Sequence, residues 1–283
     1  MKPPADNLRK YFAQFGEDRI LDAIFHDRGK GNCVEVGAND GITDSMTYHF
    51  ELSGWNCLLV EPIPDLARKI SEKRNCIVKN YAASSEEGVA SFFIAEEALG
   101  MSGLALTRKQ FHAITRAGGT PKEIKVRKKT LDGILEESNF SEIDFITIDV
   151  EGHELEVLKG FSLEKFNPRI VLLEDNSNQT DAAVQNYMKN KGYILFKRTG
   201  VNDWYACEND GELIVSGQLK AFQEERAKAY LENLIALHLS SVLSNVPDWA
   251  KSGPKKCIRL ISNLLHKFRK GKTTSAPPEE GRN

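Results

Sequence analysis

The chain has 283 residues, of which 41% are hydrophobic and 28% are charged, as in an ordinary globular protein. Its net charge of −2 gives no overall positive field, so we expect no nucleic-acid partner. No apolar run approaches the roughly 20 residues that a membrane-spanning helix needs, and residues 1–7 contain no apolar signal core. We therefore expect a cytoplasmic protein with one large α/β domain and some additions.

Short apolar strands alternate with amphipathic helices from residue 14 to residue 207, which predicts parallel βαβ units. The expected strands are 33–37, 57–61, 76–81, 143–149, 170–174, 193–198 and 203–207. The expected helices are 43–53, 64–73, 152–160 and 180–191. The last two strands should form an antiparallel hairpin, since only a short loop separates them. Five parallel strands and a terminal hairpin make the seven-stranded, mostly parallel sheet with helices on both faces that is typical of class I methyltransferases, a Rossmann-like fold.

An insertion of about 85–130 separates the third and fourth expected strands. It contains a strand-like run, 89–94, followed by a glycine-rich loop. Loops beside a rigid site often carry substrate selection. We expect the insertion either to select the substrate or to be a surface excursion without function.

The pattern changes after residue 207, which predicts a domain at 1–210 and a helical extension at 211–272. Within the extension, 217–243 reads as one long helix. The segment 255–272 combines seven basic residues with apolar ones at helical spacing and contains no acid. Such a helix can lie peripherally on an anionic membrane, which for a cytoplasmic protein would be the inner face of the cell membrane. Alternatively, it docks on its own domain or on a partner. Residues 273–283 are polar and proline-rich, so we expect them to be disordered.

The run Cys33–Gly41 reads as a strand that ends in a glycine-containing turn before a helix. Glycines at positions 37 and 41 allow the backbone to approach a ligand closely. A second strand ends in Glu61, 20 residues after Gly41, where an acid can accept hydrogen bonds from ribose hydroxyls. This combination predicts a nucleotide-like cofactor at the carboxyl ends of the strands.

The same turn argues against a dinucleotide. A dinucleotide fingerprint reads G-x-G-x-x-G, whereas here Asn39 replaces the second glycine and the third is missing. The pattern that starts at Glu35, E-x-G-x-N-x-G, looks like an S-adenosylmethionine (SAM) site instead. The alternative is a strand-turn-helix whose glycines serve only the backbone geometry.

Several motifs in a fixed order carry a resemblance to a known family. They are Gln14–Asp18 (QFGED), Val34–Gly41 (VEVGANDG), Val60–Pro62 (VEP), Thr130–Asp132 (TLD), Ile148–Glu154 (IDVEGHE) and Val157–Gly160 (VLKG). Over about 14–200 the chain resembles the FkbM family of SAM-dependent methyltransferases. The resemblance implies an O-methyltransferase that acts on a hydroxyl of a sugar or glycan, with SAM as its cofactor.

The resemblance also implies roles for individual residues. The turn under the methionine part of SAM is expected to consist of Glu35, Gly37, Asn39 and Gly41. Glu61 is expected to bind the ribose. The adenine should lie beside Ala82, Ala83 and Ser84, and the methionine end should be closed by Gln14 and Asp18.

Candidate catalytic residues follow the fourth expected strand. They are Asp149, Glu151 and His153, with Glu154 next to them. O-methylation requires removal of the hydroxyl proton, and His153 could accept it because imidazole can be neutral at cellular pH. Asp149 could orient His153 or bind substrate. Alternatively, His153 only caps the following helix and Glu154 only supports its start.

A second catalytic hypothesis involves a metal ion. Asp175 and Asn176 close the fifth expected strand, as Asp149 closes the fourth. These three oxygen ligands resemble the divalent-cation site of catechol O-methyltransferases and would suit Mg²⁺. Alternatively, Asp175 and Asn176 only form the turn after the strand.

Two other classes of protein remain open from the sequence. One is a catalytically silent binding or scaffold protein that keeps the fold, and the other is a dinucleotide-dependent oxidoreductase. The residues do not specify the acceptor or the oligomeric state.

Overall fold

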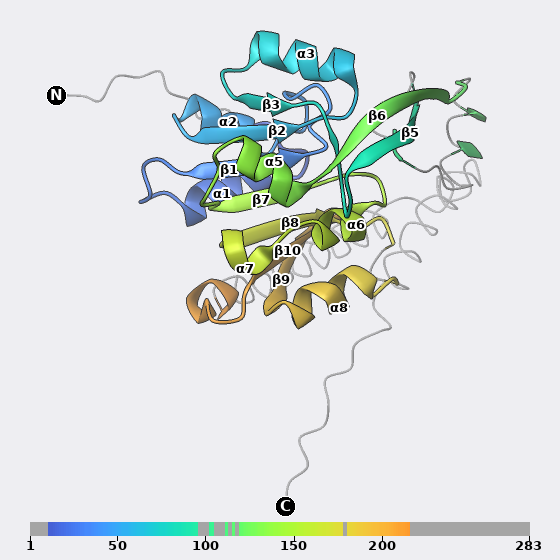
Figure 1. Ribbon diagram of the computed structural model, residues 1–283. Coiled ribbons are helices and arrows are strands. Elements are labelled where there is room, and N and C mark those ends of the chain that lie inside the picture. Colours follow the sequence, from blue (N-terminus) through green and yellow to red (C-terminus); the bar gives the residue numbers. More distant parts are fainter. Residues whose placement is uncertain are drawn as a thin grey trace, which may run out of the picture. The chain divides into compact units, whose positions relative to one another are not determined.

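The computed structural model in Figure 1 describes residues 11–95, 102–104, 111–112, 115–116, 119–177 and 180–215. The chain divides into two compact units, Met1–Gln218 and Leu219–Asn283. All described residues belong to the first unit. The expected long helix, basic segment and tail beyond residue 216 lie outside the described residues. No helix within the described part of the chain is long and apolar enough to cross a membrane.

A seven-stranded sheet forms the centre of the first unit (Figure 1). Its strands, in spatial order, are β3 (Ile77–Lys79), β2 (Asn56–Val60), β1 (Asn32–Val36), β7 (Phe145–Ile148), β8 (Ile170–Glu174), β10 (Asn202–Cys207) and β9 (Tyr193–Thr199). The first five are parallel, and β10 runs antiparallel to both of its neighbours. This arrangement confirms the expected fold class, and each strand end lies within two residues of its expected position.

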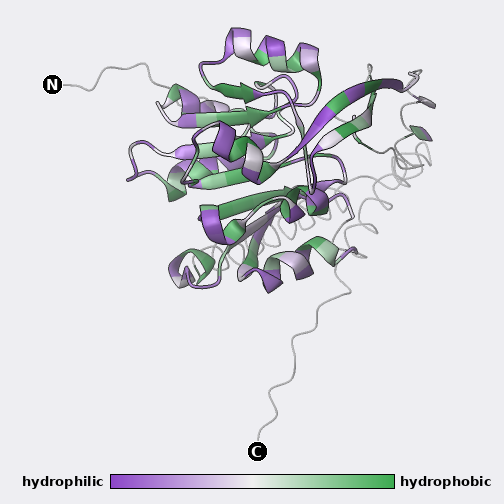
Figure 2. Ribbon diagram, viewed as in Figure 1, coloured by the Kyte–Doolittle hydropathy of each residue, from purple (hydrophilic) through white to green (hydrophobic). Residues whose placement is uncertain are grey.

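Helices cover both faces of this sheet. They are α1 (Glu17–Ile24), α2 (Tyr48–Leu52), α3 (Pro64–Lys73), α5 (Leu131–Glu137), α6 (Glu154–Lys159), α7 (Leu163–Phe166) and α8 (Ala183–Asn190). Alternate strand residues pack into two separate apolar clusters, one with α5, α6 and α7 and the other with α1 and α2. Figure 2 accordingly shows hydrophobic central strands and helices with hydrophilic outer faces.

The helix expected at 43–53 begins only at Tyr48 in the structure, as α2, so its expected start was wrong. Residues 40–47 form a turn instead, because the Asp40 carboxylate accepts hydrogen bonds from the amides of Ile42 and Thr43 at 2.8 and 2.7 Å. Asp44 also has a positive φ of 58°, which a continuous helix excludes. This turn separates β1 from α2 and becomes part of the candidate site.

A second sheet of three strands includes both ends of the expected insertion, and most of the expected glycine-rich loop between them lies outside the described residues. Its order is β4 (Ala82–Ser84), β6 (Lys122–Thr130) and β5 (Gly88–Ile94). The expected strand at 89–94 is confirmed as β5, but β6 was missed. In β6 the buried Val126 packs with Phe92 and Leu66, and partly buried Ile124 joins them. The small sheet therefore has an apolar face directed at α3 and a charged outer face.

The end of α6 packs very closely on β4. A Cβ atom at Gly160 would lie 2.1 Å from the carbonyl oxygen of Ser84. We predict that Gly160→Ala forces these elements apart and lowers the free energy of unfolding by about 1–3 kcal/mol. Urea denaturation measures this change. Gly211→Ala is the matched control, because nothing lies within 4 Å of its Cβ position; equal stability of the two variants would contradict the packing argument.

Candidate active site

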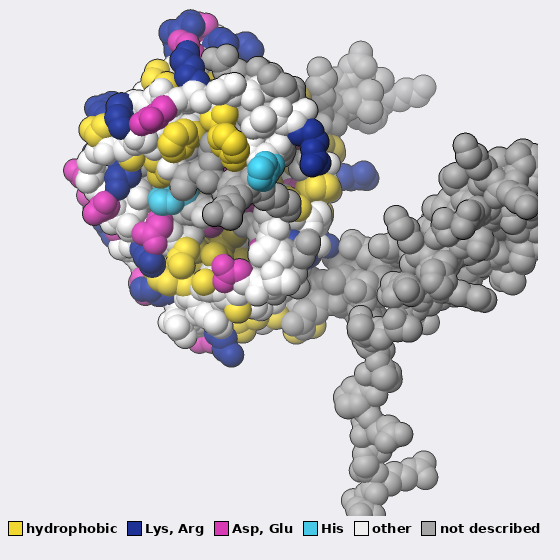
Figure 3. All heavy atoms as spheres, turned by 90° about the vertical axis from the view of Figure 1, so that its right-hand side faces the viewer, with side chains coloured by type: hydrophobic (Ala, Val, Ile, Leu, Met, Phe, Trp, Pro, Cys, Tyr) yellow, Lys and Arg dark blue, Asp and Glu magenta, His cyan; other side chains and the backbone are white. Residues whose placement is uncertain are grey.

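A cavity of about 290 Å³ lies at the carboxyl ends of the parallel strands. The cavity is lined by the following expected residues: Gln14, Glu35, Gly37, Asn39, Glu61, Ala82, Ala83, Asp149, Glu151 and His153. Figure 3 views the side of the molecule from which β5 and β6 project in Figure 1, and apolar side chains lie there beside acidic and histidine side chains. The structure thus brings residues from five separated segments to one place, as expected for ligand sites of such sheets.

The turn after β1 depends on Gly37. Its φ is +87°, and a Cβ atom there would lie 1.7 Å from the carbonyl oxygen of Asp149. The amide of Gly37 donates to the carbonyl oxygen of Val60 at 2.9 Å. Asn39 also adopts a positive φ, of 51°. Gly37 is therefore required because the turn lies directly against the end of β7, in addition to any approach to a ligand.

Gly41 does not line the cavity. Its φ is +73°, and a Cβ atom there would lie 2.9 Å from the Cγ1 atom of Ile70 on α3. The close approach expected at this glycine is therefore to α3. Gly41 supports the turn after β1, since its amide donates to the carbonyl oxygen of Ala38 at 2.7 Å.

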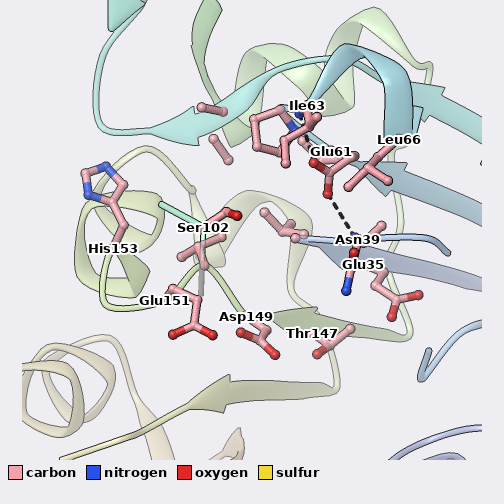
Figure 4. Close-up of a pocket in the computed structure, with 18 of the residues that line it drawn as sticks. Glu35, Asn39, Glu61, Ile63, Leu66, Ser102, Thr147, Asp149, Glu151 and His153 are labelled. Carbon is pink, nitrogen blue, oxygen red and sulfur yellow. Dashed lines mark hydrogen bonds between the residues drawn. The ribbon is translucent and has the colours of Figure 1, made fainter. Parts of the chain in front are cut away.

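Glu61 connects the turns after β1 and β2. Its carboxylate accepts hydrogen bonds from the amides of Asn39 and Ile63, each at 2.8 Å, and Figure 4 shows the first of these. Only 3% of its surface is exposed, and this burial raises the pKa of Glu61 to about 7 although the two amides oppose the rise. The carboxylate still lines the cavity, where its remaining lone pairs are suited to hydroxyl groups.

Glu35 lines the cavity but is largely engaged by the protein. Its carboxylate accepts hydrogen bonds from the Ser45 hydroxyl at 2.7 Å, the Met46 amide at 3.1 Å and the Thr47 hydroxyl. It is 7% exposed. Glu35 therefore shapes the segment between β1 and α2.

The segment before α1 reaches the cavity through Gln14. Asp18 does not line the cavity. Instead its buried carboxylate accepts hydrogen bonds from the amides of Phe12 and Ala13. Asp18 thus holds the backbone that presents Gln14.

The end of the cavity expected for adenine is mostly apolar, with Ala82 and Ala83 joined by Ile63, Leu66, Phe92 and Leu104. Sequence reasoning missed these four residues, because their approach depends on how the small sheet packs on α3. Ser84 follows Ala83 but does not line the cavity, and its hydroxyl is 3.1 Å from Nε2 of His153. Burial lowers the pKa of His153, which keeps its ring neutral at pH 7.

Three carboxyl groups converge on the opposite side. One carboxylate oxygen each from Asp149, Glu151 and Glu174 lies within 4.8 Å of the other two. Figure 4 shows Asp149 and Glu151 side by side, with His153 beyond Glu151. Desolvation by the surrounding protein and the neighbouring Glu174 raise the pKa of Asp149, although its side chain is exposed at the cavity, and burial and Glu151 raise the pKa of Glu174 to about 7. Sequence reasoning missed Glu174; its only signal was its place as the last residue of β8.

Asp175 and Asn176 do not line the cavity. The Arg198 guanidinium donates to the side-chain oxygen of Asp175 at 3.0 Å and to its carbonyl oxygen at 2.8 Å. The expected metal ligand set of Asp149, Asp175 and Asn176 is therefore not assembled in the cavity. Of the described residues, the acids that converge there with Asp149 are Glu151 and Glu174.

Glu154 has a structural role. It is buried, and its carboxylate accepts hydrogen bonds from the amides of Val150 and Gly152 at 3.2 and 3.0 Å. These bonds support the turn before α6, in which Glu151 adopts a φ of +56°. The turn directs the backbone from the end of β7 to His153.

The raised pKa of Glu61 makes stability depend on pH. A carboxyl group that binds its proton more tightly in the native state stabilises that state below its unfolded pKa of about 4.5, and this contribution is lost as pH rises through about 7. A pKa difference of this size is worth about 3 kcal/mol. We predict that the free energy of unfolding of the free protein falls between pH 5 and pH 8, and that Glu61→Gln makes the fall shallower.

Denaturation at a series of pH values measures this dependence. Glu72→Gln is the control, because Glu72 is an exposed acid on α3 whose loss should leave the slope unchanged. A Glu61→Gln slope equal to that of the unchanged protein would show that Glu61 is ionised at no cost in the native state.

Comparison with known proteins identifies the family. A family model described as "Methyltransferase FkbM domain" matches residues 35–195. No curated protein sequence matches the chain. Several solved structures are remotely similar, and three of them follow. A TehB-like SAM-dependent methyltransferase from Corynebacterium glutamicum has 10% identity and a TM-score of 0.37, covering 69% of this chain and 88% of that one.

The other two are the METTL16 methyltransferase domain (15% identity, TM-score 0.39, 67% of this chain and 65% of that one) and the fibrillarin/Nop5p complex (14%, 0.36, 71% and 88%). The family match carries the assignment, since it spans more than half of the chain. The protein is thus a methyltransferase and belongs to the FkbM family.

Proposed function

We propose that the protein is a SAM-dependent O-methyltransferase that acts on a hydroxyl of a sugar or glycan. One observation carries the cofactor part of this proposal. The Asn39 amide of the glycine turn donates to Glu61 at 2.8 Å, so the two SAM motifs meet in one cavity. The carboxyl groups at the other side of that cavity, which can bind hydroxyls, support a polyhydroxylated acceptor.

The side chains of the cavity fit the charge of SAM. The described lining residues include six acids and neither lysine nor arginine. When bound, SAM supplies a methyl group on a positively charged sulfur, and it also carries an ammonium group. In this proposal Glu61 binds the ribose, the Gly37–Asn39 turn and Gln14 lie at the methionine part, and Ala82 and Ala83 contact the adenine.

We assign removal of the acceptor proton to the carboxyl pair of Asp149 and Glu174. As the acceptor oxygen bonds to the methyl carbon and the carbon–sulfur bond breaks, the hydroxyl proton passes to the ionised member of the pair. The products are a methyl ether and S-adenosylhomocysteine. His153 is the second candidate base, but its hydrogen bond to Ser84 places it at the end proposed for adenine.

The cofactor assignment predicts selective stabilisation by SAM. A ligand that binds only the native state raises the melting temperature, so SAM should raise it and NAD(H) should not. Glu61→Ala should weaken SAM affinity by about tenfold to a hundredfold, since a hydrogen bond to a charged group is worth about 1.5–3 kcal/mol. Calorimetry measures this affinity, with Glu72→Ala as an exposed control. Stabilisation by NAD(H) instead of SAM would contradict the proposal.

The catalytic assignment predicts different effects of substitutions in the carboxyl pair and at His153. Asp149→Asn and Glu174→Gln should each lower kcat by about 10²–10⁴-fold, because each removes one carboxyl group of the pair that accepts the proton in the transition state. His153→Ala should lower kcat much less. Because the pKa of Glu174 is about 7, kcat should rise with pH up to that value, and Glu174→Gln should displace this limb. Formation of S-adenosylhomocysteine from labelled SAM with extracted glycans measures turnover.

The same assay tests the alternatives. A large loss in His153→Ala and a small one in Asp149→Asn would move the base to His153. We expect activity to persist in EDTA, because Arg198 already faces Asp175; loss in EDTA with recovery in Mg²⁺ would assign the carboxyl groups to a metal. SAM binding without turnover on any acceptor would favour a silent binding protein.

A further inference from the structure

Arg74 is a buried cation that contacts the segment 41–47, which follows the turn after β1. It follows α3, and only 4% of its surface is exposed. Its guanidinium donates to the side chain of Glu51 (2.7 Å), the carbonyl oxygen of Gly41 (2.7 Å) and the hydroxyls of Ser45 (3.1 Å) and Thr47 (3.2 Å). Three of these four acceptors belong to the segment 41–47, so Arg74 binds this segment at several points.

The two hydroxyls join Arg74 to Glu35. Arginine offers only donors, so the oxygens of Ser45 and Thr47 accept from Arg74 and their hydrogens are free to point elsewhere. Both hydroxyls donate to the Glu35 carboxylate. The guanidinium and the carboxylate lie 3.9 Å apart and are linked by two parallel hydroxyl bridges.

This arrangement also balances charge. Glu35 is 7% exposed, and an ionised carboxylate so deeply buried requires a cation or several hydrogen bonds. Arg74 supplies the positive charge and orients two of the donors. Without Arg74, the carboxylate and the bridging hydroxyls would lose the group that fixes their directions.

The turn has little room to rearrange around this cation. A Cβ atom at Gly41 would lie 2.9 Å from Ile70 and 3.5 Å from the Cδ atom of Arg74. On the other side, the Tyr48 ring lies 4.8 Å from the guanidinium carbon. The turn therefore packs directly on the end of α3, and the position of Arg74 determines the position of the turn.

We propose that Arg74 is the positioning residue that holds the segment 41–47 in its binding conformation in the free protein. This inference rests on the proposed function, because Thr43, Asp44 and Met46 of this segment line the proposed SAM site together with Glu35. Arg74 does not line the cavity itself, so it acts through these residues. A preorganised site binds its ligand with a smaller ordering cost. The loss of Arg74 should therefore affect the binding of SAM more than the chemistry.

Substitutions on and near α3 separate this role from a general structural one. Arg74→Met should weaken SAM affinity and raise the KM for SAM by about tenfold or more, while kcat at saturating SAM changes by less than about threefold. Arg74→Lys keeps the charge but has one nitrogen for four acceptors, so its affinity should be intermediate. Arg68→Met is the control: Arg68 is an exposed, ion-paired arginine on α3, and SAM affinity should not change.

A double substitution guards against simple misfolding. Arg74→Met leaves Glu35 without a cation, so Arg74→Met/Glu35→Gln should recover the melting temperature toward that of Glu35→Gln alone. Its SAM affinity should stay below that of Glu35→Gln, because the contacts to Gly41, Ser45 and Thr47 are still missing. Equal SAM affinity of these two variants would show that Arg74 only balances charge, and would overturn the inference.

Hydrogen–deuterium exchange of the free protein supplies a readout that needs no SAM. Amides of the segment 41–47 should exchange faster in Arg74→Met and in the double variant than in Arg68→Met. Unchanged exchange in this segment would overturn the inference even if SAM binds. Conversely, faster exchange in a protein that binds no SAM would support the role of Arg74 in the turn and contradict the proposed function.

Discussion

The contact between Gly37 and the end of β7 determines the geometry of this site. Only a residue without a Cβ atom allows the turn after β1 to lie against the carbonyl oxygen of Asp149. On its other side the same turn is hydrogen-bonded to Val60 at the end of β2. The turn therefore joins three strand ends, and the acids that follow β2 and β7, Glu61 and Asp149, line one cavity.

Burial of acids is the main energetic cost of the site. Glu61 and Glu174 both have a pKa raised to about 7, and Asp149 is shifted in the same direction. The free protein is therefore destabilised as these groups ionise. A positively charged ligand would favour their ionised forms and offset this loss of stability, which is consistent with the trade-off between stability and function seen at binding sites. The buried acid Glu35 has a cation beside it, because the Arg74 guanidinium lies 3.9 Å from its carboxylate.

The local sequence predicts the central sheet because each strand and helix carries its own apolar pattern. It does not predict β6, whose apolar residues Ile124 and Val126 alternate with lysine, arginine and glutamate and become a buried face only against α3. Asp175 shows the same limit at the site. A strand-end acid suggests a ligand, but its partner Arg198 is 23 residues away in the sequence. Glu174 joins the carboxyl cluster only through the packing of β8 beside β7.

In this proposal Glu61 binds the ribose of SAM and the turn after β1 binds its methionine part. A crystal structure with bound S-adenosylhomocysteine tests it most directly. Both ribose hydroxyls should lie within hydrogen-bonding distance of the Glu61 carboxylate, and the methionine part should lie along Gly37 and Asn39. Binding of the ligand elsewhere, or a ribose without contact to Glu61, would contradict this assignment.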